Sequence, residues 1–341
     1  MSALRTVTAA VLFAVPAAAV AETITVNRSA PAIDQWVYPF ASSPGTNPYA
    51  SVFSSQLPEG FTTMFDNRDG QALVAFDIAG SLPADLDPSQ FTIASATLTM
   101  RTSTNNTFQY DPTPDSYTTW LPPGDPDYTT DPDPGRALEV FGVGFRNGFS
   151  AANYVESTPY SVSGPFGQGI RNAYPIAYNS PLASLDASNN VSLAFDPESF
   201  AVGTIAGLAP GDPVAKNTDI TFALNLADPQ VLGYVKDALT QGTLFLVVAS
   251  LFPAEQQGEG TFPSFYTKEN PQVISGAQAC GRLSLVIDIP GVLGDLNGDG
   301  HVDGADLGLL LGAWGTAGPA DLNGDGVTDG ADLGLLLGNW G

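Results

Sequence analysis

The residues with the clearest chemical meaning form two copies of one acidic pattern near the C-terminal end of the sequence. The first copy runs from Asp295 to Asp306 and the second from Asp321 to Asp332. Each has oxygen-bearing side chains at positions 1, 3, 5, 9 and 12 and glycine at position 6. A calcium loop needs this arrangement, because Ca²⁺ prefers hard oxygen ligands and the chain must turn sharply at position 6. Two copies in register therefore predict two Ca²⁺ sites.

The predicted ligands are side-chain oxygens, together with a backbone carbonyl at position 7 and a water-mediated contact at position 9 of each loop. The first set is Asp295, Asn297, Asp299, His301 through its carbonyl, Asp303 and Asp306. The second set is Asp321, Asn323, Asp325, Val327 through its carbonyl, Asp329 and Asp332. No Lys or Arg follows Arg282, so the loop aspartates have no basic residue near them in the sequence. We therefore expect bound calcium to be required for folding of this segment.

Each loop is expected to open a helix, because apolar residues follow it at the i, i+3, i+4 and i+7 spacing of one helix face. These residues, which we expect to point inward, are Leu307, Leu310, Leu311 and Trp314, and then Leu333, Leu336, Leu337 and Trp340. The opposite face would carry small residues and one projecting leucine, and we predict that a partner binds it. Its residues are Gly304, Ala305, Gly308, Leu309 and Gly312, and then Gly330, Ala331, Gly334, Leu335 and Gly338. The alternative is a surface that no partner covers.

Glycine and proline precede each loop, at Pro290-Gly291 and Gly315–Pro319, where a full EF-hand would have an incoming helix. A duplicated loop with only an outgoing helix closely resembles the dockerin module, over residues 291–341. The resemblance implies docking onto a cohesin-type receptor on a scaffold or a cell surface. One departure concerns loop positions 10 and 11, where many dockerins carry hydroxyl residues. Here they are Gly304-Ala305 and Gly330-Ala331, which leaves the identity of the partner open.

The beginning of the sequence indicates export. A short basic start ending at Arg5, an apolar run from Thr6 to Val20 and the small-residue site Ala19-Val20-Ala21 predict a bacterial secretory signal peptide over residues 1–21. No later stretch is apolar enough to predict membrane insertion. The chain has 11 Lys and Arg against 35 Asp and Glu, and nucleic acid is a poor partner for such a charge. We expect an extracellular or cell-surface protein.

The body, residues 22–290, is predicted to be an antiparallel β-sandwich, so that the fold class is mainly β with a small α-helical module after it. Short segments rich in Val, Leu, Ile, Phe and Thr alternate with Gly, Pro, Asn and Asp clusters. The expected strands are 22–26, 71–78, 92–101, 137–143, 190–195, 219–226, 243–251 and 281–289. One helix is expected, with Asp228 as N-cap, Pro229 at its first position and Gly242 after its end.

The order of these segments resembles that of secreted bacterial jelly-roll modules of the DNRLRE type. The resemblance rests on Leu73–Ile78, Leu82-Pro83 and Ile93–Leu98, and on Thr243–Val247 and Phe265–Glu269 near the end of the body. It implies a jelly-roll form of the sandwich over about residues 22 to 290. Some modules of this type bind carbohydrate, so the resemblance leaves polysaccharide binding open.

One insertion, Tyr110–Arg136, stands out because proline, aspartate and aromatic residues dominate it, and this composition predicts a long loop. Aromatic rings stack on sugars and carboxylates bind hydroxyl groups, so the insertion is a candidate carbohydrate-binding surface. The candidate residues are Tyr110, Tyr117, Trp120 and Tyr128. The alternative is a solvated loop without a ligand.

Histidine-dependent catalysis has no support in the body, because the only histidine of the chain is His301 in the first loop. Paired carboxylates of a glycosidase remain open, and we expect the acids of the body to bond to local backbone or to pair with basic residues instead. Candidate acids are Asp66, Asp69, Asp77, Glu139, Glu156, Asp196, Glu198, Glu255, Glu259 and Glu269. Three hypotheses follow: a docked, non-catalytic protein that binds polysaccharide, a purely structural surface protein, and a polysaccharide-degrading enzyme.

Overall fold

A computed structural model describes residues 22–41, 43–55, 66–83, 86–164, 167–178, 185–254, 262–289 and 291–341. The predicted signal peptide, Glu255 and Glu259 lie outside these residues. The chain divides into two compact units, a larger one with most of residues 25–287 and a smaller one that includes Asp288–Gly341. Among the described residues, no helix combines the length and the apolar character needed to cross a membrane.

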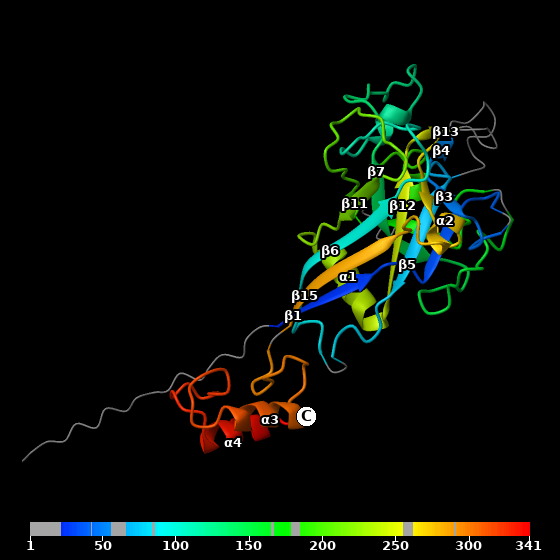
Figure 1. Ribbon diagram of the computed structural model, residues 1–341. Coiled ribbons are helices and arrows are strands. Elements are labelled where there is room, and N and C mark those ends of the chain that lie inside the picture. Colours follow the sequence, from blue (N-terminus) through cyan, green and yellow to red (C-terminus); the bar gives the residue numbers. More distant parts are fainter. Residues whose placement is uncertain are drawn as a thin grey trace, which may run out of the picture. The chain divides into compact units, whose positions relative to one another are not determined.

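The larger unit is mainly β and contains two large sheets (Figure 1). The first sheet has the strand order β1-β15-β6-β11. Its strands are β1 (Glu22–Arg28), β15 (Arg282–Ile289), β6 (Thr92–Arg101) and β11 (Asp219–Ala223). β11 pairs antiparallel with β6, with Phe222 opposite Leu98.

The second sheet has seven strands in the order β2-β5-β12-β7-β8-β9, with β10 also pairing with β7, and every pairing in it is antiparallel. Its strands are β2 (Ile33–Val37), β5 (Gln71–Asp77), β12 (Thr243–Ser250), β7 (Leu138–Phe145), β8 (Ala173–Ala177), β9 (Leu185–Asp186) and β10 (Ala201–Val202). Two short ladders join β13 (Pro253–Ala254) to β4 (Ser54–Ser55), and β14 (Ser264–Tyr266) to β3 (Tyr49–Ser51).

The two large sheets pack against each other through apolar side chains. A Cβ atom on Gly281 would lie 3.0 Å from Met100 Sδ of β6 and 3.4 Å from Val74 Cγ1 of β5, so side chains of both sheets meet there. The buried side chains of the two sheets include Leu73, Val74, Phe76, Ile93, Leu98, Leu244, Leu246, Leu285 and Ile287. This arrangement is consistent with the predicted antiparallel sandwich.

The second sheet is buried on its other face as well. Leu73, Phe141 and Phe245 form a second apolar cluster there with Tyr154 and Tyr160, which come from irregular chain. Because both faces are covered, β5 and β12 read as continuous apolar runs and not as alternating ones.

The predicted helix is confirmed as α1 (Pro229–Gln241), with Asp228 accepting a hydrogen bond from Gln230 N and Gly242 in the left-handed conformation at φ 86°. Its buried face contains Val231, Val235, Ala238 and Leu239, whereas Leu232 is only partly buried. The chain also forms α2 (Pro271–Ile274) and two 3₁₀ turns, η1 (Tyr117–Trp120) and η2 (Ala187–Asn189).

The strand expected at residues 190–195 is wrong. Asp186 accepts a hydrogen bond from Ser188 N and starts η2, and Asn190 N continues the turn by donating to Ala187 O. Asn and Asp bond to nearby backbone in this way and so favour turns over strands. The strands β2 and β8 were not expected, because polar residues and a proline interrupt their apolar pattern.

Buried acids of the larger unit are paired with arginine, as we expected for acids of the body. Arg171 Nε lies 2.6 Å from Asp66 Oδ2, and Arg68 Nη1 lies 2.7 Å from Glu139 Oε2. All four side chains are buried. Asp77, in contrast, bonds to local backbone, because its Oδ1 accepts a hydrogen bond from Ala79 N.

Replacement of one partner in such a buried pair should strongly destabilise the larger unit. We expect Asp66→Ala to lower the free energy of unfolding by about 3–5 kcal/mol, because it leaves the Arg171 guanidinium buried without its counter-charge. Asp219→Ala is the control, since Asp219 pairs with Arg101 and Arg282 at a partly exposed position and should cost only about 0–1 kcal/mol. Urea unfolding measures both, and equal losses would contradict the prediction.

Candidate metal centre

The two predicted loops lead directly into the two helices of the smaller unit, α3 (Gly304–Gly312) and α4 (Gly330–Gly338). Each helix begins with a reciprocal cap between loop positions 9 and 12. Asp303 Oδ1 accepts a hydrogen bond from Ala305 N at 2.7 Å, and Asp306 Oδ2 accepts one from Asp303 N at 2.8 Å. Asp329 and Asp332 repeat the arrangement in the second loop. Such caps satisfy the free N–H groups of the first helical turn, so loop and helix form as one unit.

The aspartates at positions 1 and 12 hold the loop around a common centre. Asp306 Oδ1 accepts hydrogen bonds from the N–H groups of Leu296 and Asn297, at 2.8 and 3.1 Å. Asp295 accepts from Gly298 N and Gly300 N, both at 2.8 Å. Each bond brings a carboxylate oxygen and a turn of the backbone together.

In the second loop, the carboxylates at positions 1 and 12 accept corresponding hydrogen bonds from backbone N–H groups. Asp332 Oδ1 accepts a hydrogen bond from Asn323 N at 3.0 Å, and Asp321 accepts from Gly324 N at 2.9 Å and Gly326 N at 2.8 Å. The two loops therefore share one hydrogen-bond pattern as well as one sequence pattern.

These bonds keep the position-12 carboxylate charged. Burial acts to raise the pKa of Asp306, but the N–H groups of Asp303, Leu296 and Asn297 outweigh it and hold the pKa below its usual value. Asp306 is therefore ionised at neutral pH, as a metal ligand has to be.

The oxygens of the first loop have the spacing that one ion requires. Asp295, Asp299 and Asp306 each place a carboxylate oxygen within 4.8 Å of the others. Oxygens on opposite sides of one Ca²⁺ lie about 4.6–5.2 Å apart, since each bond is about 2.3–2.6 Å long. The donors are all hard oxygens, which suit Ca²⁺ and not Zn²⁺. The residues present thus fit a calcium ion.

The smaller unit has a small apolar core of its own. Its buried members are Val302, Leu310, Ala320, Leu322 and Leu336, with Leu307 and Leu333 packed against them. Val302 and Leu322 belong to the loops and Leu310 and Leu336 to the helices. The core therefore depends on both loops being folded.

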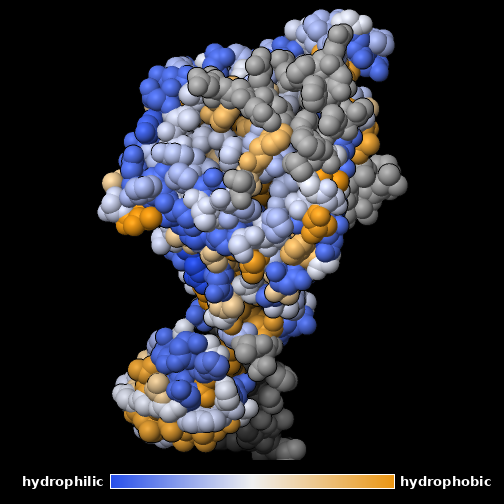
Figure 2. Space-filling view, turned by 90° about the vertical axis from the view of Figure 1, so that its right-hand side faces the viewer, coloured by the Kyte–Doolittle hydropathy of each residue, from blue (hydrophilic) through white to orange (hydrophobic). Residues whose placement is uncertain are grey.

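The inward face expected for the helices is only partly correct. Leu311 and Trp314 are 53% and 48% exposed, and Leu337 and Trp340 are 52% and 46% exposed. The helices end at Gly312 and Gly338, so both tryptophans lie beyond them. In Figure 2, apolar residues gather along one margin of the smaller unit.

The outward faces of the two repeats are also not equivalent, contrary to expectation. Leu309 is 48% exposed, whereas Leu335 is partly buried and packs against the core. The glycines and alanines at the other predicted partner positions are exposed, from Gly304 and Ala305 to Gly338.

The aromatic residues of the insertion are only partly at the surface. Tyr110 is buried, so its ring is not open to a sugar, which corrects the expectation for that residue. Tyr117, Trp120 and Tyr128 are half-buried. The Arg136 guanidinium lies 5.8 Å from the centre of the Trp120 ring. These rings therefore offer a smaller aromatic surface than the sequence predicted.

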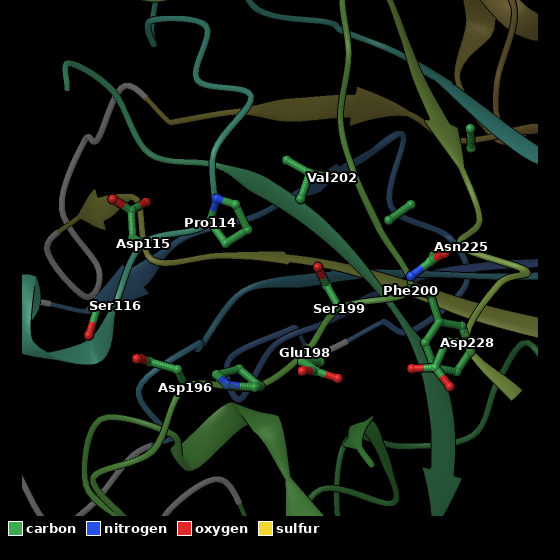
Figure 3. A pocket seen from close by; sticks show the side chains of 13 residues that line it. Pro114, Asp115, Ser116, Asp196, Glu198, Ser199, Phe200, Val202, Asn225 and Asp228 are labelled. Atoms are coloured by element: carbon green, nitrogen blue, oxygen red, sulfur yellow. The ribbon is translucent and has the colours of Figure 1, made fainter. Parts of the chain in front are cut away.

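A hollow of about 640 Å³ lies beside the insertion and is lined by Asp115, Asp196, Glu198 and Asp228, among others (Figure 3). Several of these acids hold local structure. Asp196 Oδ1 accepts a hydrogen bond from Tyr117 N, Asp228 caps α1, and Asp115 pairs with Arg136. Sequence reasoning missed the hollow, because its lining comes from segments that lie far apart in the chain.

Burial raises the pKa of Asp115 to about 7, although the Arg136 guanidinium acts in the opposite direction. This acid of the hollow therefore titrates near neutral pH and is not a permanent negative charge.

Comparisons of the chain with protein-family models, with curated proteins and with solved structures give no match. Inference about function therefore rests on the residues and geometry above.

Glycine at loop position 6 should be a structural requirement, and a matched pair of variants tests it. Gly326 has φ 97°, and an added Cβ would meet no neighbour within 4 Å. Gly326→Ala should therefore cost about 1–2 kcal/mol through backbone strain alone. Gly334→Ala, which lies in the middle of α4 with equally open space, should stabilise by about 0.4–1 kcal/mol. Thermal unfolding in calcium measures both, and effects of the same sign would contradict the prediction.

Proposed function

We propose that the C-terminal unit is a dockerin-like module that binds two Ca²⁺ ions and anchors the exported protein to a cohesin-type partner. The observation that carries this proposal is the carboxylate set of Asp295, Asp299 and Asp306, with oxygens within 4.8 Å of one another. The second loop has corresponding hydrogen bonds to its position-1 and position-12 carboxylates and the same helix cap, which supports a second site of the same kind.

Bound Ca²⁺ would supply the positive charge that the loops lack. Each loop brings four aspartates together, and no Lys or Arg occurs after Arg282. Without a cation, these carboxylates repel one another, and the small apolar core of the unit has to oppose that repulsion alone. The side chains of Asp295, Asn297, Asp299 and Asp306, the His301 carbonyl and, through water, Asp303 would hold the first ion.

Exposed apolar side chains support the docking role. Leu309, Leu311, Trp314, Leu337 and Trp340 are each about half exposed, and all lie in the segment Asp288–Gly341 of the smaller unit. Apolar patches of this kind on a small soluble unit mark interaction sites. We propose that the partner covers these residues together with the small residues of the outward face, Gly304, Ala305, Gly308 and Gly312 in the first repeat and Gly330, Ala331, Gly334 and Gly338 in the second.

For the body we propose a non-catalytic jelly-roll sandwich that binds polysaccharide through the half-buried rings of Tyr117, Trp120 and Tyr128. The pairing of its acids favours binding over hydrolysis. Asp66 and Glu139 are paired with arginine, and Asp34, Glu156 and Glu269 surround Lys268. Carboxylates that are neutralised in this way are poorly placed to act as acid and base.

Calcium should order the C-terminal unit. We expect chelation to reduce the helical circular dichroism of residues 288–341, and calcium to restore it with two ions bound. Asp306→Ala removes a ligand, a helix cap and the acceptor of the hydrogen bond from Leu296 N together, so it should abolish the first site and leave the second partly intact. Calorimetric titration counts the ions. A dichroism spectrum that does not respond to chelation would rule out the proposal.

Docking should depend on exposed apolar residues of the first repeat. Leu309→Asp should weaken capture by a panel of cohesin domains at least tenfold and leave calcium affinity unchanged, because this side chain is largely exposed. Leu335→Asp is the matched variant. It should lower the thermal stability of the unit itself, because Leu335 packs against the core. If cohesin domains captured the Leu309→Asp variant as well as the wild type, Leu309 would not be part of the docking surface.

A further inference from the structure

A second kind of acidic cluster lies at the base of the insertion Tyr110–Arg136. Asp111 and Asp115 come from its beginning and Asp133 from its end, and each places a carboxylate oxygen within 4.8 Å of the others. This spacing is the one found in the first C-terminal loop, and it lies within the span of a single Ca²⁺ ion.

One oxygen of this cluster has no hydrogen-bond partner among the described residues. Asp111 is 4% exposed, and its Oδ1 accepts hydrogen bonds from Thr113 N and Thr113 Oγ1, at 2.9 and 2.7 Å. Its Oδ2 is buried and has no hydrogen-bond partner within the described residues. A buried carboxylate oxygen without a donor costs about 1–3 kcal/mol or more, so the structure around it calls for a positive group at this point.

The neighbouring hydroxyl leads to the same conclusion. Thr113 Oγ1 lies 2.7 Å from Asp111 Oδ1 and 2.6 Å from Asp133 Oδ2. A hydroxyl has one proton and can donate to only one of these two oxygens. The other short oxygen–oxygen contact needs an additional proton or a cation.

The charge at the base of the insertion is also unbalanced. Asp111, Asp115, Asp131 and Asp133 lie there, and the only basic residue of the insertion is Arg136. Arg136 Nη1 bonds to Asp115 and Asp131, at 2.9 and 3.2 Å.

Another acidic group of the same unit shows what this cluster lacks. Asp34, Glu156 and Glu269 also bring their oxygens within 4.8 Å of one another. There, Lys268 Nζ bonds to all three carboxylates, so the chain provides its own cation. Asp111 and Asp133 have no basic side chain bonded to them in the part of the chain that the structure describes.

We propose that Asp111, Asp115 and Asp133 form a third calcium site, separate from the C-terminal loops, that fastens the insertion to the second sheet. A bound ion would satisfy the unpartnered Oδ2 of Asp111, and Thr113 Oγ1, which lies beside both Asp111 and Asp133, would be a further oxygen ligand. Asp115 Oδ2 also accepts a hydrogen bond from Ala137 N, next to the start of β7. An ion here connects both ends of the insertion near the start of β7 and holds Tyr117 and Trp120 in place.

The test is the calcium stoichiometry of the full mature chain, measured by equilibrium dialysis against ⁴⁵Ca²⁺. We expect Asp111→Asn and Asp133→Asn each to lose one bound ion relative to wild type. Asp127→Asn is the matched control, with the same change of charge in the same insertion at an exposed aspartate outside the cluster. Unchanged binding in the two cluster variants would overturn the proposal.

A second measurement avoids any change in the insertion and separates this site from the C-terminal ones. In the double variant Asp306→Ala, Asp332→Ala, calcium should still protect the chain from chymotrypsin cleavage after Tyr117, Trp120 and Tyr128. Absence of protection would overturn the third site even if the cluster variants failed to fold. If calcium binding is unchanged in the double variant Asp306→Ala, Asp332→Ala and is lost in Asp111→Asn, the result contradicts the C-terminal sites and supports this one.

Discussion

Compensation of carboxylate charge is the constraint on which this structure depends most, because the chain carries a formal net charge of −24. A carboxylate that leaves water loses its hydration, and something inside the protein has to replace it. The protein does this in different ways at different depths. Inside the larger unit, Arg171 and Arg68 pair directly with Asp66 and Glu139. At its margin, Lys268 is shared among three acids. In the C-terminal loops, backbone N–H groups take this role.

Backbone donors stabilise a carboxylate without adding a whole positive charge, and this difference separates the two units. The larger unit has enough apolar core and enough arginine to fold around its buried acids. The C-terminal unit has a small core that depends on both loops, and no basic residue within it. We therefore expect the stability of this unit to depend more on bound cations than that of the larger unit does. The cluster at Asp111 is an exception inside the larger unit, since the single arginine of the insertion bonds to Asp115 and Asp131, and among the described residues no basic side chain bonds to Asp111 or Asp133.

Local chemistry made much of the fold predictable from sequence. The strands β5 and β12 were visible as apolar runs, and β6 and β15 as segments in which apolar and polar residues alternate. The helix α1 was predicted with both caps because Asp228, Pro229 and Gly242 act within one turn of their own position. The predictions that failed concern features that depend on contacts between residues far apart in the sequence. Spacing showed which residues share a helix face, but not that a nine-residue helix would end before Trp314. The hollow near Asp196 lies between the insertion and residues 196–202 and 223–228. The closeness of Asp133 to Asp111 requires the insertion to fold back on itself. No local pattern indicates either arrangement.

The exposed leucines and tryptophans bear on how docking and calcium would be connected. The helices α3 and α4 are nine residues long, which is too short for stable isolated helices in water, and each begins with a cap supplied by its own loop. If the loops open, the caps at Asp303 and Asp329 are lost, and the arrangement of Leu309, Leu311 and Leu337 goes with them. A partner that recognises this arrangement binds only the ordered state, so its binding and that of calcium stabilise each other. Calcium dependence of docking then follows from the shortness of the helices and requires no contact between the ions and the partner.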